Sequence, residues 1–359
     1  MKLVSPILKH VAYPLLARAG YFRRRAQHGQ VCVVTYHGVR PAGYVSRDAA
    51  LDGSMVSAER FREQIRLLQE RYRIISPEDF LRSFRDGTRL PERAVLLTCD
   101  DGVVNTVTDM LPILLECSVR CLFFITCASL SEKPGMLWYE RLKLMVNEAQ
   151  AGAISLRVGQ GEWICAASAD RHAFWWKVVR EVSKRTEHER ATFLEQARSD
   201  LGLGEAWDRR YSEQTELYRR FFLLSTKEVM ELQEYGMSIG AHSLSHPLLS
   251  KLDEEGSRGE IEESRKLLEK ALGRAVEAFA YPFGSSESVT AREFALAEKA
   301  GFRCAFLNMG GGFGAEMPRY ALPRVHVTAD MGLGEFEAHV SGFYRRLRGA
   351  PAISVAPAA

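Results

Sequence analysis

The sequence predicts an α/β fold in which parallel strands alternate with helices and the sheet closes into a barrel. Short apolar runs without a polar face recur along the chain, as expected for strands buried on both sides of a parallel sheet. Amphipathic stretches that begin with capping residues separate these runs and indicate helices. Polar residues directly follow several runs, at the place where the carboxyl ends of parallel strands meet.

Residues 1–30 predict a short amphipathic helix with a basic end. Ile7, Val11 and Leu15 recur at helical spacing, and the arginines 23–25 follow them. The stretch lacks the long apolar core of a signal peptide or of a membrane span. We expect this helix to pack on the domain, and a helix lying on a membrane surface is the alternative.

The remaining elements follow in regular order. The apolar runs expected to be strands are 31–37, 93–99, 120–126, 237–241, 278–281, 304–307 and 322–327. Helices are expected after Ser57, from Ser76 to Phe84, from Gly102 to Cys117, from Ser225 to Gly236, from Glu255 to Leu272 and from Thr290 to Ala300. Their starts carry typical signals, such as the capping box of Ser225 and Glu228. The pattern ends near residue 346, so 347–359 is expected to be a flexible tail.

The stretch 138–222 interrupts this alternation. It is rich in charged and aromatic residues, and helical segments are expected at 138–151 and 172–201. We interpret it as an inserted helical subdomain that shapes a substrate cleft. The barrel is then formed by residues 31–137 and 223–346.

Composition restricts the possible partners and the compartment. A net charge of +3 over 359 residues argues against a general nucleic-acid binder. The seven cysteines have no regular spacing, and several of them, such as Cys99 and Cys121, lie in apolar runs, which is typical of core residues. Unpatterned cysteines and the lack of a cleavable signal predict a cytoplasmic location. Peripheral membrane contact at the cytoplasmic face would follow if residues 1–30 bind lipid.

Two polar groups follow predicted strands and carry candidate chemistry. Asp100 and Asp101 end one strand, and adjacent side chains on an extended chain point in opposite directions, so we expect them to have different roles. His242 and His246 lie four residues apart, and a helical turn after Ile239 would direct both imidazoles to one metal ion. A solvent-exposed Asp-Asp-Gly turn and a pair of loop histidines are the alternatives without function.

Three motifs, taken together, resemble the polysaccharide deacetylases, which are chitin-deacetylase-like carbohydrate esterases. Thr98-Cys-Asp-Asp-Gly102 resembles the family's Thr-Phe-Asp-Asp-Gly motif, and His242-Ser-Leu-Ser-His246 matches its His-Ser/Thr-x-x-His motif. Phe279-Ala-Tyr-Pro-Phe-Gly284 resembles its third motif. The motifs occur in the family's order within residues 31–327. The resemblance implies a distorted (β/α) barrel with fewer than eight strands.

The resemblance also implies roles for these residues. Asp101, His242 and His246 would bind a divalent metal ion, with zinc as the default and cobalt, nickel or manganese as alternatives. Such an ion acidifies bound water and polarises a carbonyl group, and Asp100 would take the proton from the water. The wall of the groove for the acetyl group and the sugar would come from Tyr281, Pro282 and Phe283.

The sequence departs from the family pattern at several points. Ala280 replaces an arginine that positions the catalytic aspartate in many members, and Arg324 stands at the place expected for a family histidine. We expect Arg324 to contact the substrate region and to take over part of the work of the missing arginine. Tyr36-His37 resembles the strand end that supplies the proton donor in exopolysaccharide deacetylases. His37 is therefore the predicted general acid, with His326 as the alternative.

The predicted function is metal-dependent hydrolysis of an N-acetyl group, or an O-acetyl group, on an amino sugar of a polysaccharide or a lipid-linked glycan. One alternative is a hydrolase of a non-sugar C–N bond on the same fold. Another is an inactive glycan-binding relative, which Ala280 suggests. The four intact residues of the first two motifs argue against lost activity.

Overall fold

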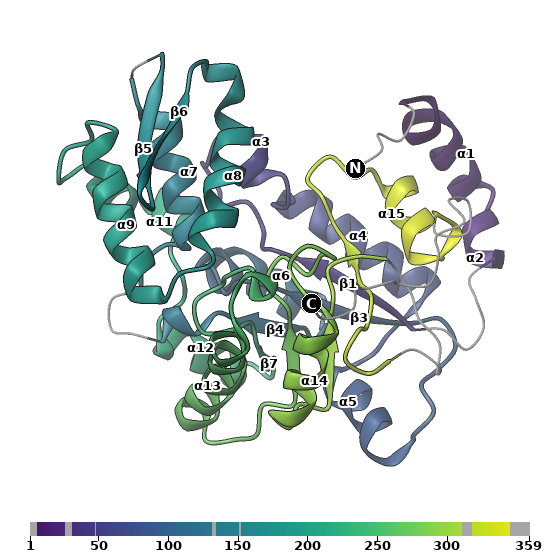
Figure 1. The fold of residues 1–359 in the computed structure, drawn as a ribbon. Helices are drawn as coiled ribbons and strands as arrows, with labels where there is room; N and C mark the ends of the chain where they lie inside the picture. Colours follow the sequence, from purple (N-terminus) through teal and green to yellow (C-terminus); the bar gives the residue numbers. More distant parts are fainter. Residues whose placement is uncertain are drawn as a thin grey trace.

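Seven parallel strands form one curled sheet in the order β10-β1-β3-β4-β7-β8-β9 in this computed structural model (Figure 1). The structure describes residues 6–25, 31–46, 48–130, 134–150, 152–310 and 318–344. The strands are β1 Cys32–Tyr36, β3 Ala94–Cys99, β4 Leu122–Ile125, β7 Ser238–Ala241, β8 Ala278–Ala280, β9 Cys304–Phe306 and β10 Val325–His326. A two-residue strand, β2 Arg73–Ile74, pairs with the start of β3.

The segment before β10 brings the two edges of the sheet together. Leu322 forms a parallel bridge with Phe306 of β9, and three residues later Val325 pairs with Val34 of β1. The predicted barrel with fewer than eight strands around the ring is therefore confirmed. The last strand is shorter than the predicted 322–327 because this segment crosses from one partner strand to the other.

The two faces of the sheet have different partners. Alternate residues such as Leu96, Phe124 and Phe306 point to one side, where Phe80 of the helix α5 packs against them. The opposite side packs against the surrounding helices. These helices are α4 Ala58–Arg71, η2 Thr106–Met110, α6 Leu111–Glu116, α12 Thr226–Glu234, α13 Glu254–Leu272 and α14 Ala291–Lys299, whereas α5, on the first side, spans Pro77–Asp86. The carboxyl ends of the strands are left free to carry polar side chains.

The insertion lies beside the barrel and has its own apolar core (Figure 1). Its elements are α7 Trp138–Glu148, β5 Ile154–Val158, β6 Gly161–Cys165, α8 Arg171–Val182, α9 Glu187–Asp200, α10 Arg209–Glu213 and α11 Thr215–Phe221. The insertion is mostly helical, as predicted, but β5 and β6 form an antiparallel hairpin that was not predicted. The alternation of Ile154, Leu156 and Val158 with polar residues was a signal for it. The predicted helix 172–201 is two helices, because Thr186 forms a capping box that starts the second.

The N-terminal segment packs on the barrel. The elements η1 Leu8–Ala12, α1 Tyr13–Arg18 and α2 Tyr21–Arg25 lie against α15 Leu333–Val340. Among the described residues, no helix combines the length and the apolar character needed to cross a membrane. All seven cysteines lie in the described part of the chain, where none forms a disulfide and all except Cys117 are buried, as predicted for core residues. The predicted tail 347–359 lies outside the described residues.

Candidate metal and catalytic site

The chain turns sharply after β3 and thereby separates the two aspartates. Asp100 continues the strand direction, and its backbone N–H donates to the Tyr36 carbonyl. Asp101 and Gly102 both adopt left-handed backbone conformations, with φ of 76° and 77°. Such a conformation is strained for a residue other than glycine and re-aims the side chain. The two carboxylates therefore face different partners, as predicted.

The histidine motif also turns through left-handed residues. Ser243 and His246 have φ of 64° and 58°, so the helical turn predicted after Ile239 is wrong. The Ser243 hydroxyl accepts a hydrogen bond from the backbone N–H of His246 at 2.9 Å and tightens this turn. The two imidazoles nevertheless converge, because the backbone of His246 is redirected instead of continuing as a helix.

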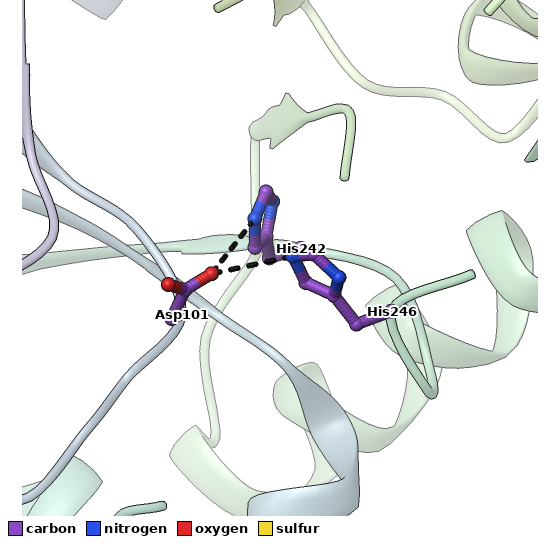
Figure 2. Close-up of side chains that lie close together, drawn as sticks. All are labelled: Asp101, His242 and His246. Carbon is purple, nitrogen blue, oxygen red and sulfur yellow. Dashed lines mark ion pairs between the residues drawn. The ribbon is translucent and has the colours of Figure 1, made fainter. Parts of the chain in front are cut away.

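Asp101, His242 and His246 form one buried cluster (Figure 2). Asp101 Oδ1 lies 3.4 Å from His242 Nε2 and 3.3 Å from His246 Nε2, and all the ligand atoms lie within 4.8 Å of one another. Ligands at about 2.1 Å around a tetrahedral zinc ion are separated by about 3.4 Å, so these distances fit an ion between the side chains.

The protonation of the cluster also fits a metal site. The Nδ1 atom of His242 lies 2.7 Å from the Ala280 carbonyl, which can only accept, so Nε2 carries the lone pair that faces Asp101. Burial alone would raise the pKa of Asp101, but the neighbouring His242 and His246 hold it well below its usual value. Burial lowers the pKa of His246, whereas for His242 the effect of burial is outweighed by Asp100 and Asp101, which raise its pKa. A deprotonated carboxylate and neutral imidazoles are the forms that bind metal ions.

Asp100 forms a buried ion pair with Arg324. The guanidinium donates to both carboxylate oxygens, at 2.7 and 2.5 Å, and its Nε donates to the Leu307 carbonyl. Burial alone would raise the pKa of Asp100, but the charge of Arg324 lowers it below the usual value. Arg324 is only 1% exposed, so its side chain is not accessible to a substrate, in contrast to the predicted contact with the substrate region. The ion pair therefore fixes the orientation of the Asp100 carboxylate.

His37 and His326 meet at the rim of this cluster, with ring centroids 4.9 Å apart. His326 is held at both nitrogens, by Asn308 at Nδ1 and by the Ser54 hydroxyl at Nε2. Burial and the neighbouring His37 lower the pKa of His326 to about 3. His37 is half-buried, and its Nδ1 atom is buried without a hydrogen-bond partner among the described residues.

The third motif contributes fewer groove residues than predicted. Tyr281 is fully buried, and its hydroxyl donates to the Tyr320 carbonyl, so its role as a groove wall is wrong. Pro282 is also buried. Phe283 is half-buried, has a left-handed backbone, and places its ring 4.8 Å from the His246 ring. Only Phe283 among these three contacts the candidate site.

A family model for polysaccharide deacetylases matches residues 203–305, which include the histidine motif and the third motif. Over these residues the chain is similar to the polysaccharide deacetylases. Asp100 and Asp101 lie outside the matched range, but the fold brings Asp101 to both histidines of the matched part. The family assignment made from the three motifs is therefore confirmed.

Related proteins agree with this assignment. YxkH of Bacillus subtilis (strain 168), named as a polysaccharide deacetylase, is 26% identical over 117 residues, which are 33% of this chain and 41% of YxkH. The match thus spans about two-fifths of that relative. Streptococcus pyogenes deacetylase PplD, solved in complex with acetate, superposes with a TM-score of 0.55 and 16% identity, over 88% of this chain and 99% of PplD.

IcaB from Ammonifex degensii superposes with a TM-score of 0.54 and 17% identity, over 88% of this chain and 98% of IcaB. A de-N-acetylase from Aggregatibacter actinomycetemcomitans superposes with a TM-score of 0.53 and 13% identity, over 86% of this chain and 99% of the de-N-acetylase chain. At these identities the three structures establish a shared fold.

The insertion reaches the candidate site, which was not predicted from the sequence. The indole N–H of Trp138 donates to the His246 carbonyl at 3.0 Å. The ring of Tyr139 lies 5.0 Å from the His246 ring and 5.1 Å from that of Phe283. Adjacent aromatic residues at the start of an insertion were the available signal, but nothing local connects them with residue 246.

A buried ionic network also joins the insertion to the histidine loop. Glu260 accepts from the backbone N–H of Ser245 at 2.8 Å, and the Ser245 hydroxyl bonds to both Glu260 and Arg190. Arg190 comes from α9 of the insertion, and its guanidinium lies over the Trp138 ring at 5.6 Å. The loop that carries His246 is thus held by the barrel and by the insertion.

Proposed function

We propose that this protein is a metal-dependent deacetylase that hydrolyses the N-acetyl group of an amino sugar in a polysaccharide or a lipid-linked glycan. The observation that carries the proposal is the buried cluster of Asp101, His242 and His246 beside the ion-paired Asp100. The match of residues 203–305 to the polysaccharide deacetylase family supports an acetylated glycan as substrate. One structural neighbour is a de-N-acetylase, which supports an amide as the scissile group.

The residues present fit a divalent cation, with zinc as the default. Two imidazole nitrogens and one carboxylate oxygen leave coordination positions open, which is typical of catalytic zinc sites. When bound, such an ion polarises the acetyl carbonyl and lowers the pKa of water. Cobalt, nickel and manganese also accept this set of ligands.

Asp100 is the proposed base for the attacking water. Its ion pair with Arg324 keeps the carboxylate ionised and fixes its orientation. Each carboxylate oxygen retains a lone pair after it accepts a hydrogen bond from the guanidinium, so Asp100 can still accept a proton. As the water oxygen bonds to the acetyl carbon, its proton passes to Asp100.

His37 is the proposed acid for the departing amine. Cleavage of the C–N bond leaves a nitrogen that needs a proton, and the products are acetate and the free amino sugar. His326 has a pKa of about 3, so it carries no extra proton near neutral pH, and both its nitrogens already have protein partners. His37 has an unpartnered buried Nδ1 among the described atoms and lies beside the same cluster.

Acetate release after metal removal and replacement tests the proposal. The chelated protein should release no acetate from N-acetylated glycans, and one of zinc, cobalt, nickel or manganese should restore the activity. Asp100→Asn should abolish turnover while metal content stays unchanged. The matched control is His188→Ala, because His188 is an exposed histidine of the insertion.

The substrate panel should contain N-acetylated, O-acetylated and non-sugar amides. Release from O-acetyl esters or non-sugar amides alone would contradict the proposed substrate class. Full activity in the chelated protein would contradict the metal dependence.

A further inference from the structure

The N-terminal helical run, residues 6–18, is fixed to the barrel along one face. Tyr13 is fully buried, and the Lys9 ammonium lies 2.5 Å from an Asp330 carboxylate oxygen and 3.3 Å from one of Glu335. The helix approaches α15 closely at Gly334, where an added Cβ would lie 2.7 Å from the Pro14 nitrogen. Figure 1 shows α1 and α15 side by side at the edge of the molecule. The orientation of this helix is therefore set by the domain.

The opposite face of the run is apolar and exposed. Ile7, Val11 and Leu15 are 72%, 52% and 58% exposed. Their spacing of four residues places them in one row along the helix. No other element of the described chain carries three exposed large apolar side chains. Single exposed apolar residues are ordinary, but a row on one rigid helix indicates an interaction surface.

Exposed basic residues follow this row along the chain. Arg18 follows Leu15 by three residues and is exposed, and Arg23 and Arg24 of α2 are also exposed. A bilayer with anionic headgroups offers both apolar chains and negative charge, whereas a single apolar protein patch offers only the first. The combination of an apolar row and exposed arginines fits the bilayer.

The row also has a defined position relative to the candidate site. Asp330, which binds Lys9, lies four residues after His326, and His326 borders the site. The start of the helix is thus attached to the rim where the carboxyl ends of the strands carry the catalytic side chains. A surface that binds the row would lie close to this rim.

We propose that Ile7, Val11 and Leu15, together with Arg18 and Arg23, form a docking surface for an anionic lipid bilayer. The helix lies in the headgroup region with the apolar row toward the acyl chains, and the arginines contact lipid phosphates. This inference stands without the proposed function. If both hold, docking brings the catalytic rim close to membrane-bound glycans.

Co-sedimentation of the full chain with vesicles tests the docking surface. We expect binding to vesicles of phosphatidylglycerol and phosphatidylcholine at low salt, and weak binding to phosphatidylcholine alone. The triple variant Ile7→Gln, Val11→Gln and Leu15→Gln should bind at least about 30-fold more weakly, because three apolar side chains lose their insertion. Arg18→Gln and Arg23→Gln should each weaken binding about fivefold, and added salt should reduce these differences.

A second triple variant is the matched control. Ile164→Gln, Met230→Gln and Leu267→Gln remove three exposed apolar side chains from other elements and should leave binding unchanged. Thermal unfolding of all variants verifies that the fold is retained. The proposal is overturned if the wild type does not bind anionic vesicles, or if both triples lose binding equally. A wild-type dimer that the first triple variant dissociates would also overturn it, because the row would then bind a second copy.

Discussion

Replacing Arg324 with leucine should destabilise the fold, because the buried Asp100 carboxylate would then have no charged partner. Asp100 and Arg324 are 2% and 1% exposed and share two hydrogen bonds, of 2.7 and 2.5 Å. Removing one partner of such a pair leaves an uncompensated buried charge and typically costs about 3–5 kcal/mol. Urea denaturation at pH 7 in the presence of a chelator would measure this loss in the free energy of unfolding without a contribution from bound metal.

The loss of unfolding free energy in Arg324→Leu should depend on pH. In the wild type, burial alone would raise the pKa of Asp100, but Arg324 lowers it below the usual value. The pair therefore stabilises the protein above the unfolded pKa, about 3.9, and this contribution is lost as the pH falls through the folded pKa. Arg324→Leu removes the largest influence that lowers the pKa of Asp100 while burial remains, so this pKa should rise. A carboxyl with a raised folded pKa destabilises the protein above that pKa, and protonation relieves the penalty. The difference in the free energy of unfolding between Arg324→Leu and the wild type should thus become smaller as the pH falls toward 4.

Two further variants test whether the unpaired buried charge of Asp100 causes the loss of stability. Arg82→Leu removes an arginine that is half exposed in its ion pair with Asp79, and it should cost less than about 1 kcal/mol. The double variant Arg324→Leu with Asp100→Asn should lose less than the sum of the single losses, because no unpaired buried charge remains. An Arg324→Leu loss as small as that of Arg82→Leu, or one that does not change with pH, would refute the buried-pair account.

The remaining predictions concern the acid, the metal and the N-terminal helix. His37→Ala should lower kcat about 10²- to 10⁴-fold with metal content unchanged, whereas His326→Ala should lower kcat only slightly. Steady-state kinetics would measure both, and the reverse ranking would make His326 the acid. His242→Ala should lose the bound ion, as measured by equilibrium dialysis, and retained metal would contradict its role as a ligand. Gly334→Ala should cost about 1–3 kcal/mol of unfolding free energy because its Cβ meets the N-terminal backbone, whereas Gly332→Ala, with open space, should be near neutral in the same denaturation experiment.

The strands and the residues at their ends could be predicted because the signals are local. An apolar run that stops at Asp100 identifies both a buried strand and a polar end. Parallel strands place their carboxyl ends at one rim, so Asp101 and His242 could be expected together despite their separation in sequence. The register of β1 against β3 likewise places His37 next to the aspartates.

Other features depend on backbone geometry and distant contacts. The left-handed conformations of Asp101 and His246 leave no sequence signal, since neither residue is glycine. The direction of Tyr281 was mistaken because alternation along β8 decides it, and the motif gives no register for this strand. Trp138 binds the His246 loop from 108 residues away, and no local pattern predicts such a pairing.

These distant contacts explain how the strained loop persists. A left-handed non-glycine residue costs on the order of 1–3 kcal/mol, and the loop carries two of them, at Ser243 and His246. The Trp138 indole binds the His246 carbonyl, and the Glu260 carboxylate binds the Ser245 backbone. Since the first contact comes from the insertion and the second from α13, neither part alone holds the imidazole toward Asp101. The insertion is therefore part of the framework that would preorganise the proposed metal ligands.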